Sequence, residues 1–241
     1  WDFNDGLEDF LNDLFNSTKF ETWKIQREEL NSFLLKSKIE SFSSLISKIY
    51  LFYGIIHSKN EIKYWGDKNK LWKEKLPKII EYYPKAKFIH LVRDGRDVAC
   101  SFKKLKENKS SSLYAPKLPN EIDKIAERWN VNVEAIIKFL EENKGVSSYT
   151  IRYEDLILNT EKELIKICHF LELPFDYNMI NYLELNKREI YEPIEFLAWK
   201  SKLNSLPDKN NIGKYKNILS KKEIELFEKI TLTNLKRFNY E

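Results

Sequence analysis

One short segment places the tightest limits on how this chain folds. Residues 88–92 (Phe-Ile-His-Leu-Val) are apolar enough to form a parallel strand that is buried on both faces. The charged run Arg93-Asp-Gly-Arg-Asp97 follows at once, and Asp94 is a suitable cap for a helix that reaches about Lys106. Open α/β sheets bind ligands at the carboxyl ends of such strands. We therefore expect Arg93 to lie at a ligand-binding edge of a sheet.

This edge has the chemistry of an anion site. The start of the following helix offers free N–H groups and the positive end of the helix dipole. Arg93 and Arg96 would complete an anion pocket, and Ser101, two turns further on, would add a donor. The net charge of +4 suits a small anionic molecule better than a nucleic acid. A purely structural Arg–Asp salt bridge at this corner is the alternative interpretation.

Helical and strand patterns surround the segment. Predicted helices are Leu7–Phe15, Arg27–Lys36, Ser41–Ile56, Leu71–Tyr83 and Ile122–Leu140, with capping boxes that open two more at Thr160–Glu163 and Ser220–Glu223, and further strands are Ile62–Trp65 and Tyr149–Arg152. Helices that alternate with short buried strands predict an α/β sheet with helices packed around it. We expect a single domain over residues 1–241, with a helical segment at 1–58 and an α/β core with C-terminal helices at 59–241.

Several stretches occur in an informative order along the chain. They are Tyr64-Trp-Gly-Asp-Lys-Asn69, Pro84–Ser101, Arg128-Trp-Asn130, Ile151-Arg-Tyr-Glu-Asp-Leu156, Phe170-Leu-Glu-Leu-Pro-Phe175 and Asn211-Ile-Gly-Lys-Tyr-Lys216. Together they resemble the motifs of sulfotransferases that use 3′-phosphoadenosine 5′-phosphosulfate, in the branch that includes tyrosylprotein sulfotransferases and their bacterial relatives. The resemblance implies a helix-rich, P-loop NTPase-like fold of three layers, α/β/α, with a parallel sheet. It also implies an enzyme that transfers a sulfuryl group from that nucleotide to a hydroxyl acceptor, without a metal.

The resemblance also implies roles for individual residues. Arg93 and Ser101 would bind the 3′-phosphate of the nucleotide, Tyr153 would lie near the adenine, and Lys214 would close over the nucleotide. Lys68 would sit near the sulfuryl group and neutralise charge on the bridging oxygen as its bond breaks. Sulfuryl transfer resembles phosphoryl transfer, which depends mainly on positioning and charge stabilisation.

Two positions depart from the family pattern, and one of its parts is not recognisable. Asn69-Lys70 stands where the family has Thr-Pro, and Tyr215 stands where it has Trp. None of the six glycines lies between a strand and a helix beside Ser or Thr, as the loop that binds the 5′-phosphosulfate requires. The chain begins at Trp1, so we expect the first strand, this loop and the general base to lie upstream. The chain alone is then expected to be inactive.

The remaining features exclude some classes of protein and leave others open. Cys100 and Cys168 lack the spacing of metal ligands and are expected to be buried, and His90 is expected to pack in the core. No apolar run approaches the roughly 18 residues of a membrane span. We expect a cytoplasmic protein, or one of the Golgi lumen if it is eukaryotic with an upstream anchor. A kinase-like phosphotransferase fragment and a non-catalytic scaffold remain alternatives, and the acceptor and the oligomeric state stay open.

Overall fold

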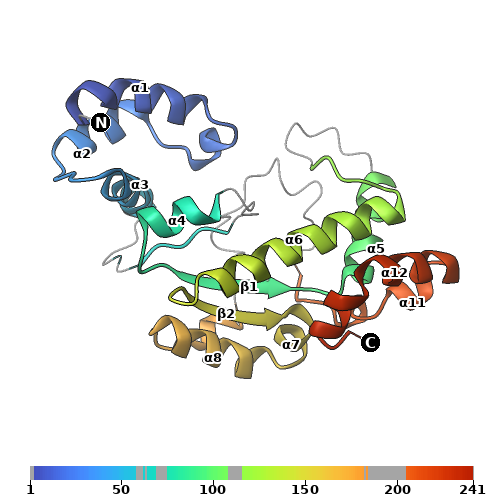
Figure 1. The fold of residues 1–241 in the computed structure, drawn as a ribbon. Coiled ribbons are helices and arrows are strands. Elements are labelled where there is room, and N and C mark those ends of the chain that lie inside the picture. The colour runs from blue at the N-terminus through green and yellow to red at the C-terminus, as the bar shows by residue number, and fades with distance from the viewer. Residues whose placement is uncertain are drawn as a thin grey trace. The chain divides into compact units, whose positions relative to one another are not determined.

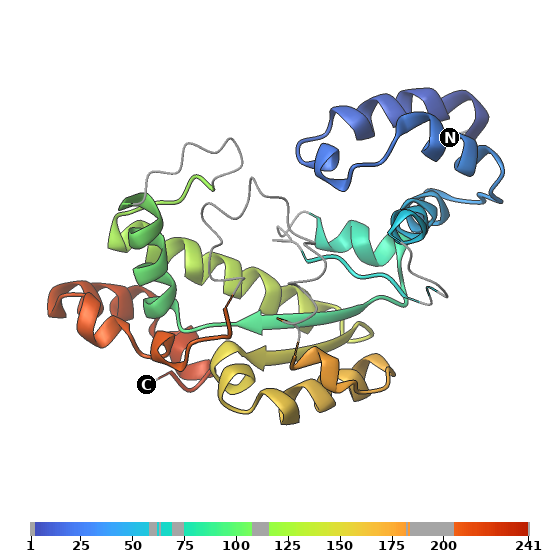
Figure 2. The same cartoon turned by 180° about the vertical axis from the view of Figure 1, so that it is seen from behind.

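The computed structural model describes residues 3–57, 62, 64–68, 75–107, 116–181, 183 and 205–240. The chain divides into two compact units. The first contains Trp1–Leu71 and Glu81–Tyr83, and the second contains Trp72–Ile80 and Pro84–Glu241. Figures 1 and 2 show the elements from opposite sides. Each unit has a hydrophobic core of its own.

The first unit is helical, as the sequence predicts. Its elements are α1 (Phe3–Asn16), the 3-10 helix η1 (Phe20–Trp23), α2 (Arg27–Leu35) and α3 (Phe42–Ile56). Apolar side chains from all four form its core, which includes Leu7, Leu11, Phe20, Leu30, Leu34, Leu45, Ile49 and Phe52. A capping box begins α3: the Ser44 N–H donates to the Ser41 hydroxyl at 3.1 Å, and the Ser41 N–H donates to the Ser44 hydroxyl at 3.0 Å.

The sequence predicts a strand at Ile62–Trp65, and this prediction is wrong for the residues that the structure describes. Ile62, Tyr64 and Trp65 belong to irregular backbone that continues through Lys68. Instead of entering a sheet, Trp65 stacks its ring on Tyr50 of α3. Aromatic residues favour strands only weakly when no partner strand is present. The ring contact with Tyr50 therefore outweighs the strand preference of this segment. Helix α4 (Leu76–Tyr82) follows, inside the predicted range Leu71–Tyr83.

The second unit contains a parallel pair of strands with helices on both faces. Strands β1 (Lys87–Val92) and β2 (Ser147–Arg152) pair in parallel, and Lys87 lies opposite Ser147 in the register. Phe88 packs on Phe139 of α6 (Ile122–Glu142), with ring centroids 5.9 Å apart. Tyr149 points to the opposite face, where its ring lies 5.7 Å from that of Phe170 in α8 (Thr160–Leu171). Figure 1 shows this α/β/α arrangement, which confirms the predicted fold class.

The sequence suggested that strand β1 is buried on both faces, and the structure shows that it is not. Its side chains alternate: His90 and Val92 are buried, whereas Ile89 is 42% and Leu91 is 51% exposed. The buried side faces α6 and α12 (Lys221–Arg237), where His90 lies near Phe238 just beyond the end of α12. On the other face, α8 contacts both strands: Phe170 packs against Tyr149 of β2, and its carbonyl accepts a hydrogen bond from Lys87 at the start of β1 at 3.0 Å. The apolar run predicted the strand correctly but could not say which elements cover it.

The helices around the sheet begin as their sequences dictate, with one exception. In α5 (Gly95–Glu107), the Asp94 carboxylate accepts the Arg96 N–H at 2.9 Å and caps the helix as predicted. The capping box at Ser220 is also confirmed and begins α12. The box expected at Thr160 does not form. Helix α7 (Tyr153–Leu158) ends just before it, so Asn159 serves both as the C-cap of α7 and as the N-cap of α8.

The remaining described elements are short. They are the 3-10 helices η2 (Tyr177–Met179) and η4 (Lys209–Asn211) and the single-turn helix α11 (Tyr215–Ile218). The core of the second unit is formed mainly by β1, α5, α6, α11 and α12 and includes Val92, Ala99, Ile125, Trp129, Val133, Tyr215, Phe227 and Leu235. Helices α6 and α12 lie side by side in both ribbon views and both contribute side chains to this core.

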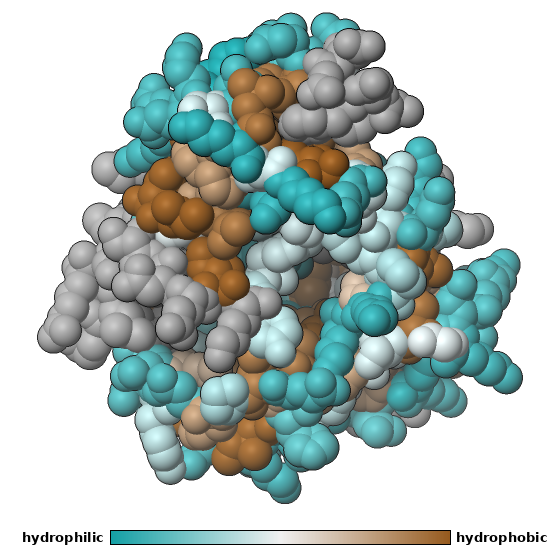
Figure 3. All heavy atoms as spheres, turned by 90° about the vertical axis from the view of Figure 1, so that its left-hand side faces the viewer, coloured by the Kyte–Doolittle hydropathy of each residue, from teal (hydrophilic) through white to brown (hydrophobic). Residues whose placement is uncertain are grey.

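The surface carries scattered apolar side chains. Figure 3 shows one face of the molecule, on which hydrophobic side chains reach the surface between hydrophilic ones. Exposed examples are Leu35 in α2, Ile55 in α3, Leu158 in α7 and Ile165 in α8. Single exposed apolar residues of this kind are normal on proteins and do not identify a partner. Within the described ranges, no helix has the length and apolar character needed to cross a bilayer.

The first prediction concerns the close packing at Gly95. A Cβ atom added there would lie 2.6 Å from Phe227 Cζ and 2.7 Å from Trp129 Cδ2. Gly95→Ala should therefore lower the free energy of unfolding by about 1–3 kcal/mol, the usual cost of overpacking. Gly145→Ala is the control, because a Cβ there meets no atom within 4 Å and should change stability by less than about 0.5 kcal/mol. Equal effects in urea unfolding would contradict this account.

The second prediction concerns the pH dependence of stability. Burial lowers the pKa of His90 below its ordinary value of 6.5, so the folded state holds the neutral imidazole. The unfolded chain then binds more protons, and the free energy of unfolding should fall as the pH drops through 6.5 toward the lowered folded-state pKa. In His90→Phe this loss should be smaller.

The control for this prediction is an exposed histidine. His169→Gln serves as that control, because it removes a histidine from the surface of α8 and leaves the core position at His90 intact. Urea unfolding between about pH 7.5 and pH 5 measures the free energy of unfolding of both variants. An unchanged pH profile in His90→Phe would show that His90 does not carry the effect.

Candidate functional site

Arg93 lies directly after β1 and is held by three neighbouring elements. Its Nη2 donates to the carbonyl of Asn211 at 2.9 Å, and its guanidinium lies 4.4 Å from the centre of the Tyr153 ring. The indole N–H of Trp129 donates to the Arg93 carbonyl at 3.1 Å. Contacts from η4, α7 and α6 therefore fix both the backbone and the side chain of this half-buried arginine.

One donor of Arg93 is still unused. Its Nε is buried and has no hydrogen-bond partner among the residues that the structure describes. Buried polar groups are nearly always satisfied, and exceptions require an explanation. A guanidinium with a spare donor, placed over an aromatic ring at the end of a parallel strand, has the chemistry of an anion-binding group.

Ser101 and Lys214 form a second contact nearby. The Lys214 ammonium donates to the Ser101 hydroxyl at 3.0 Å, and that hydroxyl donates to the Asp97 carbonyl at 3.1 Å. Lys214 follows Gly213, whose φ of +70° lies in the left-handed region that favours glycine. The glycine therefore allows the turn that brings a lysine from the C-terminal part of the chain onto α5.

The carboxylate of Asp97 connects this turn to the start of α5. Its Oδ2 accepts the Gly213 N–H at 2.7 Å, and its Oδ1 accepts the Tyr215 N–H at 3.0 Å. Asp97 is fully buried, and burial raises its pKa, whereas the hydrogen bonds from Tyr215 and Gly213 act in the opposite direction. Lys214 lies between the two bonded residues, so Asp97 fixes the backbone that carries it.

Sequence reasoning missed Asp97. The signal that could have identified it is the second aspartate of Arg93-Asp-Gly-Arg-Asp97, which is followed directly by Val98, Ala99 and Cys100. A carboxylate in such an apolar stretch must find hydrogen-bond donors when it is buried. Its actual donors lie 116 and 118 residues away in the chain, so no local pattern indicates them.

Arg96 does not belong to an anion pocket, which corrects the expectation from the sequence. It is buried and forms two hydrogen bonds to Asp94, from Nε at 3.0 Å and from Nη2 at 2.8 Å. Its Nη1 donates to Glu228 at 2.5 Å, and its Nη2 also donates to the Tyr240 carbonyl. The ring of Tyr215 lies 4.1 Å from its guanidinium carbon. Arg96 is thus the structural Arg–Asp corner that the sequence left open as an alternative.

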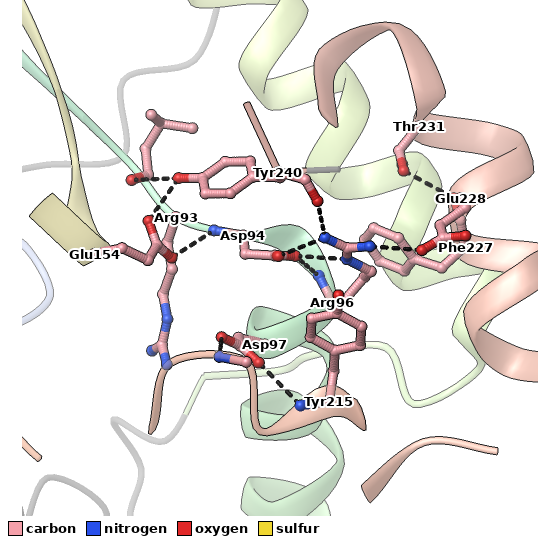
Figure 4. Close-up of polar contacts among 12 residues, drawn as sticks. Arg93, Asp94, Arg96, Asp97, Glu154, Tyr215, Phe227, Glu228, Thr231 and Tyr240 are labelled. Carbon is pink, nitrogen blue, oxygen red and sulfur yellow. Dashed lines mark hydrogen bonds and ion pairs between the residues drawn. The ribbon is translucent and has the colours of Figure 1, made fainter. Parts of the chain in front are cut away.

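The C-terminal tyrosine completes this corner (Figure 4). The Tyr240 hydroxyl donates to Glu154 at 2.8 Å, and Glu154 in turn accepts the Asp94 N–H at 3.0 Å. In Figure 4 the side chain of Arg93 points away from this cluster, whereas that of Arg96 points into it. The two arginines of the motif therefore have separate surroundings: Arg96 fixes the corner, and Arg93 extends from it.

The structure brings together four of the five residues that the sequence singled out. Arg93 contacts Tyr153, Lys214 contacts Ser101, and the turn over residues 211–215 touches both pairs. All four lie in the second unit. Lys68 lies in the first unit, exposed on the loop after α3. The departures at Asn69 and Lys70 fall outside the described residues, and Tyr215, the other departure, is buried beneath Arg96.

Other reactive side chains are inert or exposed. Cys100 and Cys168 are buried as predicted, and burial raises the pKa of the Cys100 thiol to about 11, so it stays protonated at neutral pH. His90 is buried in the core as expected, and His57 and His169 are exposed. Across the described ranges, no group of three or more His, Cys, Asp or Glu side chains is placed to hold a metal ion.

Comparison with known proteins identifies the family. The model of the sulfotransferase family matches residues 6–177. The chain belongs to the sulfotransferase family. The matched residues include Lys68, Arg93, Ser101 and Tyr153, whereas Lys214 lies beyond them.

Curated relatives from nematodes match part of this sulfotransferase chain. It is 31% identical over 126 residues to a Caenorhabditis elegans protein named "Putative protein-tyrosine sulfotransferase", a match that covers 50% of this chain and 43% of that protein. It is 24% identical over 110 residues to Protein-tyrosine sulfotransferase A of the same organism, covering 46% of this chain and 28% of the relative. The match therefore spans less than half the length of either relative.

A solved structure is also similar. It is a sulfotransferase domain from the curacin biosynthetic pathway, 20% identical, with a TM-score of 0.48. The similarity covers 83% of this chain and 77% of that one.

The third prediction tests the role of Asp97. Asp97→Ala removes the acceptors of two backbone N–H groups, which should lower the free energy of unfolding by about 2–4 kcal/mol. Hydrogen exchange at Gly213 and Tyr215 should also become faster, because these are the N–H groups that Asp97 bonds.

The matched control is another acidic residue in the first turn of a helix. Asp123 holds that position in α6, as Asp97 does in α5. Asp123→Ala should cost less than about 1 kcal/mol, the scale of a helix-dipole contribution. If both variants lost the same stability and exchange at residues 213–215 did not change, Asp97 would not be the anchor of this turn.

Proposed function

We propose that the second unit binds the 3′-phosphate and adenosine part of 3′-phosphoadenosine 5′-phosphosulfate. The observation that carries this proposal is the state of Arg93: a half-buried guanidinium at a strand end, stacked over Tyr153, with one buried donor unused. Ser101 and Lys214, which contact each other, would add a hydroxyl and a second cation. A doubly charged phosphate is the ligand that such a donor set suits best.

The environment of Tyr153 fits a nucleotide as well as a phosphate. Its ring is only partly buried, so a face or edge remains available beside the Arg93 guanidinium. Adenine rings stack favourably on aromatic and guanidinium planes. The same short segment could then contact the base with Tyr153 and the phosphate with Arg93, which are two distinct chemical groups of one molecule.

Sulfuryl transfer to a hydroxyl acceptor is the reaction that we propose for the protein. The acceptor oxygen bonds to sulfur, the bond from sulfur to the bridging 5′-phosphate oxygen breaks, and the hydroxyl proton passes to a general base. Adenosine 3′,5′-diphosphate is the product that leaves. Lys68 would stabilise the negative charge that develops on the bridging oxygen, where a positioned cation acts most strongly. No metal takes part in this proposal.

The proposal treats the two units as parts of one sulfotransferase domain. The family match supports this view, because residues 6–177 include described segments of both units. The names of the nematode relatives specify a protein tyrosine as the acceptor of those proteins. For this chain we propose the broader class, a molecule with an acceptor hydroxyl.

The fourth prediction tests the 3′-phosphate site in the natural full-length protein. Arg93→Ala should weaken the binding of adenosine 3′,5′-diphosphate by about 2–4 kcal/mol, the cost of leaving a charged partner unmatched. Binding of adenosine 5′-monophosphate, which lacks the 3′-phosphate, should change by less than about 1 kcal/mol. Isothermal titration calorimetry measures both ligands.

Arg237 provides the matched control for this experiment. It is an exposed arginine at the end of α12 that pairs with Glu141 at 3.3 Å. Arg237→Ala should leave the affinity for both nucleotides unchanged. The assignment of the 3′-phosphate site would be wrong if Arg93→Ala bound adenosine 3′,5′-diphosphate with the affinity of the unmodified protein.

A further inference from the structure

The loop that carries Lys68 is attached to α3 through Trp65. The Trp65 ring stacks face to face on Tyr50, with centroids 4.1 Å apart and an angle of 9° between the planes. On a second side it meets Tyr83 edge-on, with centroids 5.4 Å apart at 80°. The Tyr83 hydroxyl donates to the carbonyl of Ser43 in α3 at 3.1 Å. All of these residues belong to the first unit.

Tyr50 also interacts with the residue just before the lysine. Burial, followed by electrostatic interactions with Asp67 and Tyr83 and a hydrogen bond to Asp67, raises the pKa of Tyr50 to about 12. The Tyr50 phenol is the donor of this hydrogen bond, and the Asp67 carboxylate is its acceptor. One tyrosine thus contacts the loop at two positions, Trp65 and Asp67, and Lys68 follows immediately.

Such a double contact matters because no helix or strand contains the described residues 64–68, and their side chains are exposed, Trp65 at 37%. An unrestrained loop samples many conformations, whereas a cation that stabilises a transition state must hold a defined place. A stacked aromatic pair on a helix supplies that restraint.

We propose that Tyr50 is a positioning residue for Lys68: it clamps Trp65 to α3 and so fixes the loop from which the lysine extends. This inference rests on the proposed role of Lys68 in sulfuryl transfer. Tyr50 acts through the loop and touches no reacting group.

Tyr53 offers a matched control on the same helix. Both tyrosines are half-buried and contact Trp23, with ring centroids 5.2 Å away for Tyr50 and 4.7 Å for Tyr53. The next ring contact of Tyr53 is with His57 at 4.4 Å, at the end of α3, whereas that of Tyr50 is with Trp65 in the loop. Truncation of either removes a similar side chain from the same helix, and only Tyr50 should affect the loop.

The first experiment measures the mobility of the loop in this chain by backbone NMR relaxation. Tyr50→Ala should lower the order parameters of residues 64–68 toward or below about 0.6, the range of flexible backbone, because the stack that restrains Trp65 is lost. Tyr53→Ala should leave these residues unchanged, and Tyr50→Phe, which keeps the ring, should change them less than Tyr50→Ala. Trp65→Ala removes the same stack from the exposed side and replaces Tyr50→Ala if that variant does not fold. Equal order parameters for residues 64–68 in the Tyr50→Ala and Tyr53→Ala variants would overturn the inference.

The second experiment measures kinetics in the natural full-length protein. Tyr50→Ala should lower kcat roughly tenfold and leave KM for the nucleotide within about twofold, because the affected loop positions a catalytic cation. Tyr50→Phe should recover most of this loss. The double variant Tyr50→Ala with Lys68→Ala should be no slower than Lys68→Ala alone, a result that a merely structural role of Tyr50 would not produce.

The outcomes separate this inference from the proposed function. An unchanged kcat in Lys68→Ala would overturn the proposed role of Lys68, and the inference with it. A large loss in Lys68→Ala combined with normal kcat in Tyr50→Ala would overturn the inference alone. Additive losses in the double variant would also overturn it, since they would show that Tyr50 acts independently of Lys68.

Discussion

A buried carboxylate at the start of α5 holds the candidate site together. Asp97 is removed from water, which is costly for a charged group, and two backbone N–H groups offset that cost. Both belong to a turn more than a hundred residues further along the chain, on either side of Lys214. Without these bonds the turn would keep its contacts at Asn211 and Tyr215, but the contact of Lys214 with Ser101 would be less firmly supported. The geometry at the carboxyl end of β1 therefore depends on a contact between distant parts of the chain.

The two arginines of the motif differ in burial, and this difference separates a structural arginine from the one that we propose binds a ligand. Arg96 is buried, and its guanidinium is bonded to Asp94, Glu228 and the Tyr240 carbonyl, all of them protein groups. Removing one partner of such a buried pair typically costs about 3–5 kcal/mol, because the other charge is left without compensation. Arg93 instead rests on a single carbonyl and an aromatic ring, and keeps one donor unused. A buried structural arginine and an arginine with an unused donor thus lie three residues apart.

Much of this arrangement could be predicted from local sequence. The apolar run before Arg93 correctly indicated β1, and helix periodicity indicated α1, α2, α3 and α6 close to their observed bounds. The burial and the partners of Arg96 could not be predicted from local sequence, because Glu228 and Tyr240 lie 132 and 144 residues away in the chain. The exposure of Leu91 could not be predicted for a similar reason. The sequence of a strand shows that its residues are apolar, whereas their burial depends on which elements cover each face of the sheet. Trp65 belonged to a run with strand character, and a long-range ring contact decided its structure instead.

The two cations that we propose for the reaction are fixed by different kinds of interaction. Arg93 extends from a strand end, and hydrogen bonds from α6 and to the turn before α11 define its position within a packed core. Lys68 extends from an exposed loop whose attachment to α3 is an aromatic stack on Tyr50. Hydrogen bonds impose direction and distance, as recognition of a phosphate requires. Stacking instead holds the plane of one ring against another, so the contact of Trp65 with Tyr50 attaches the loop to α3 and limits the conformations from which Lys68 extends.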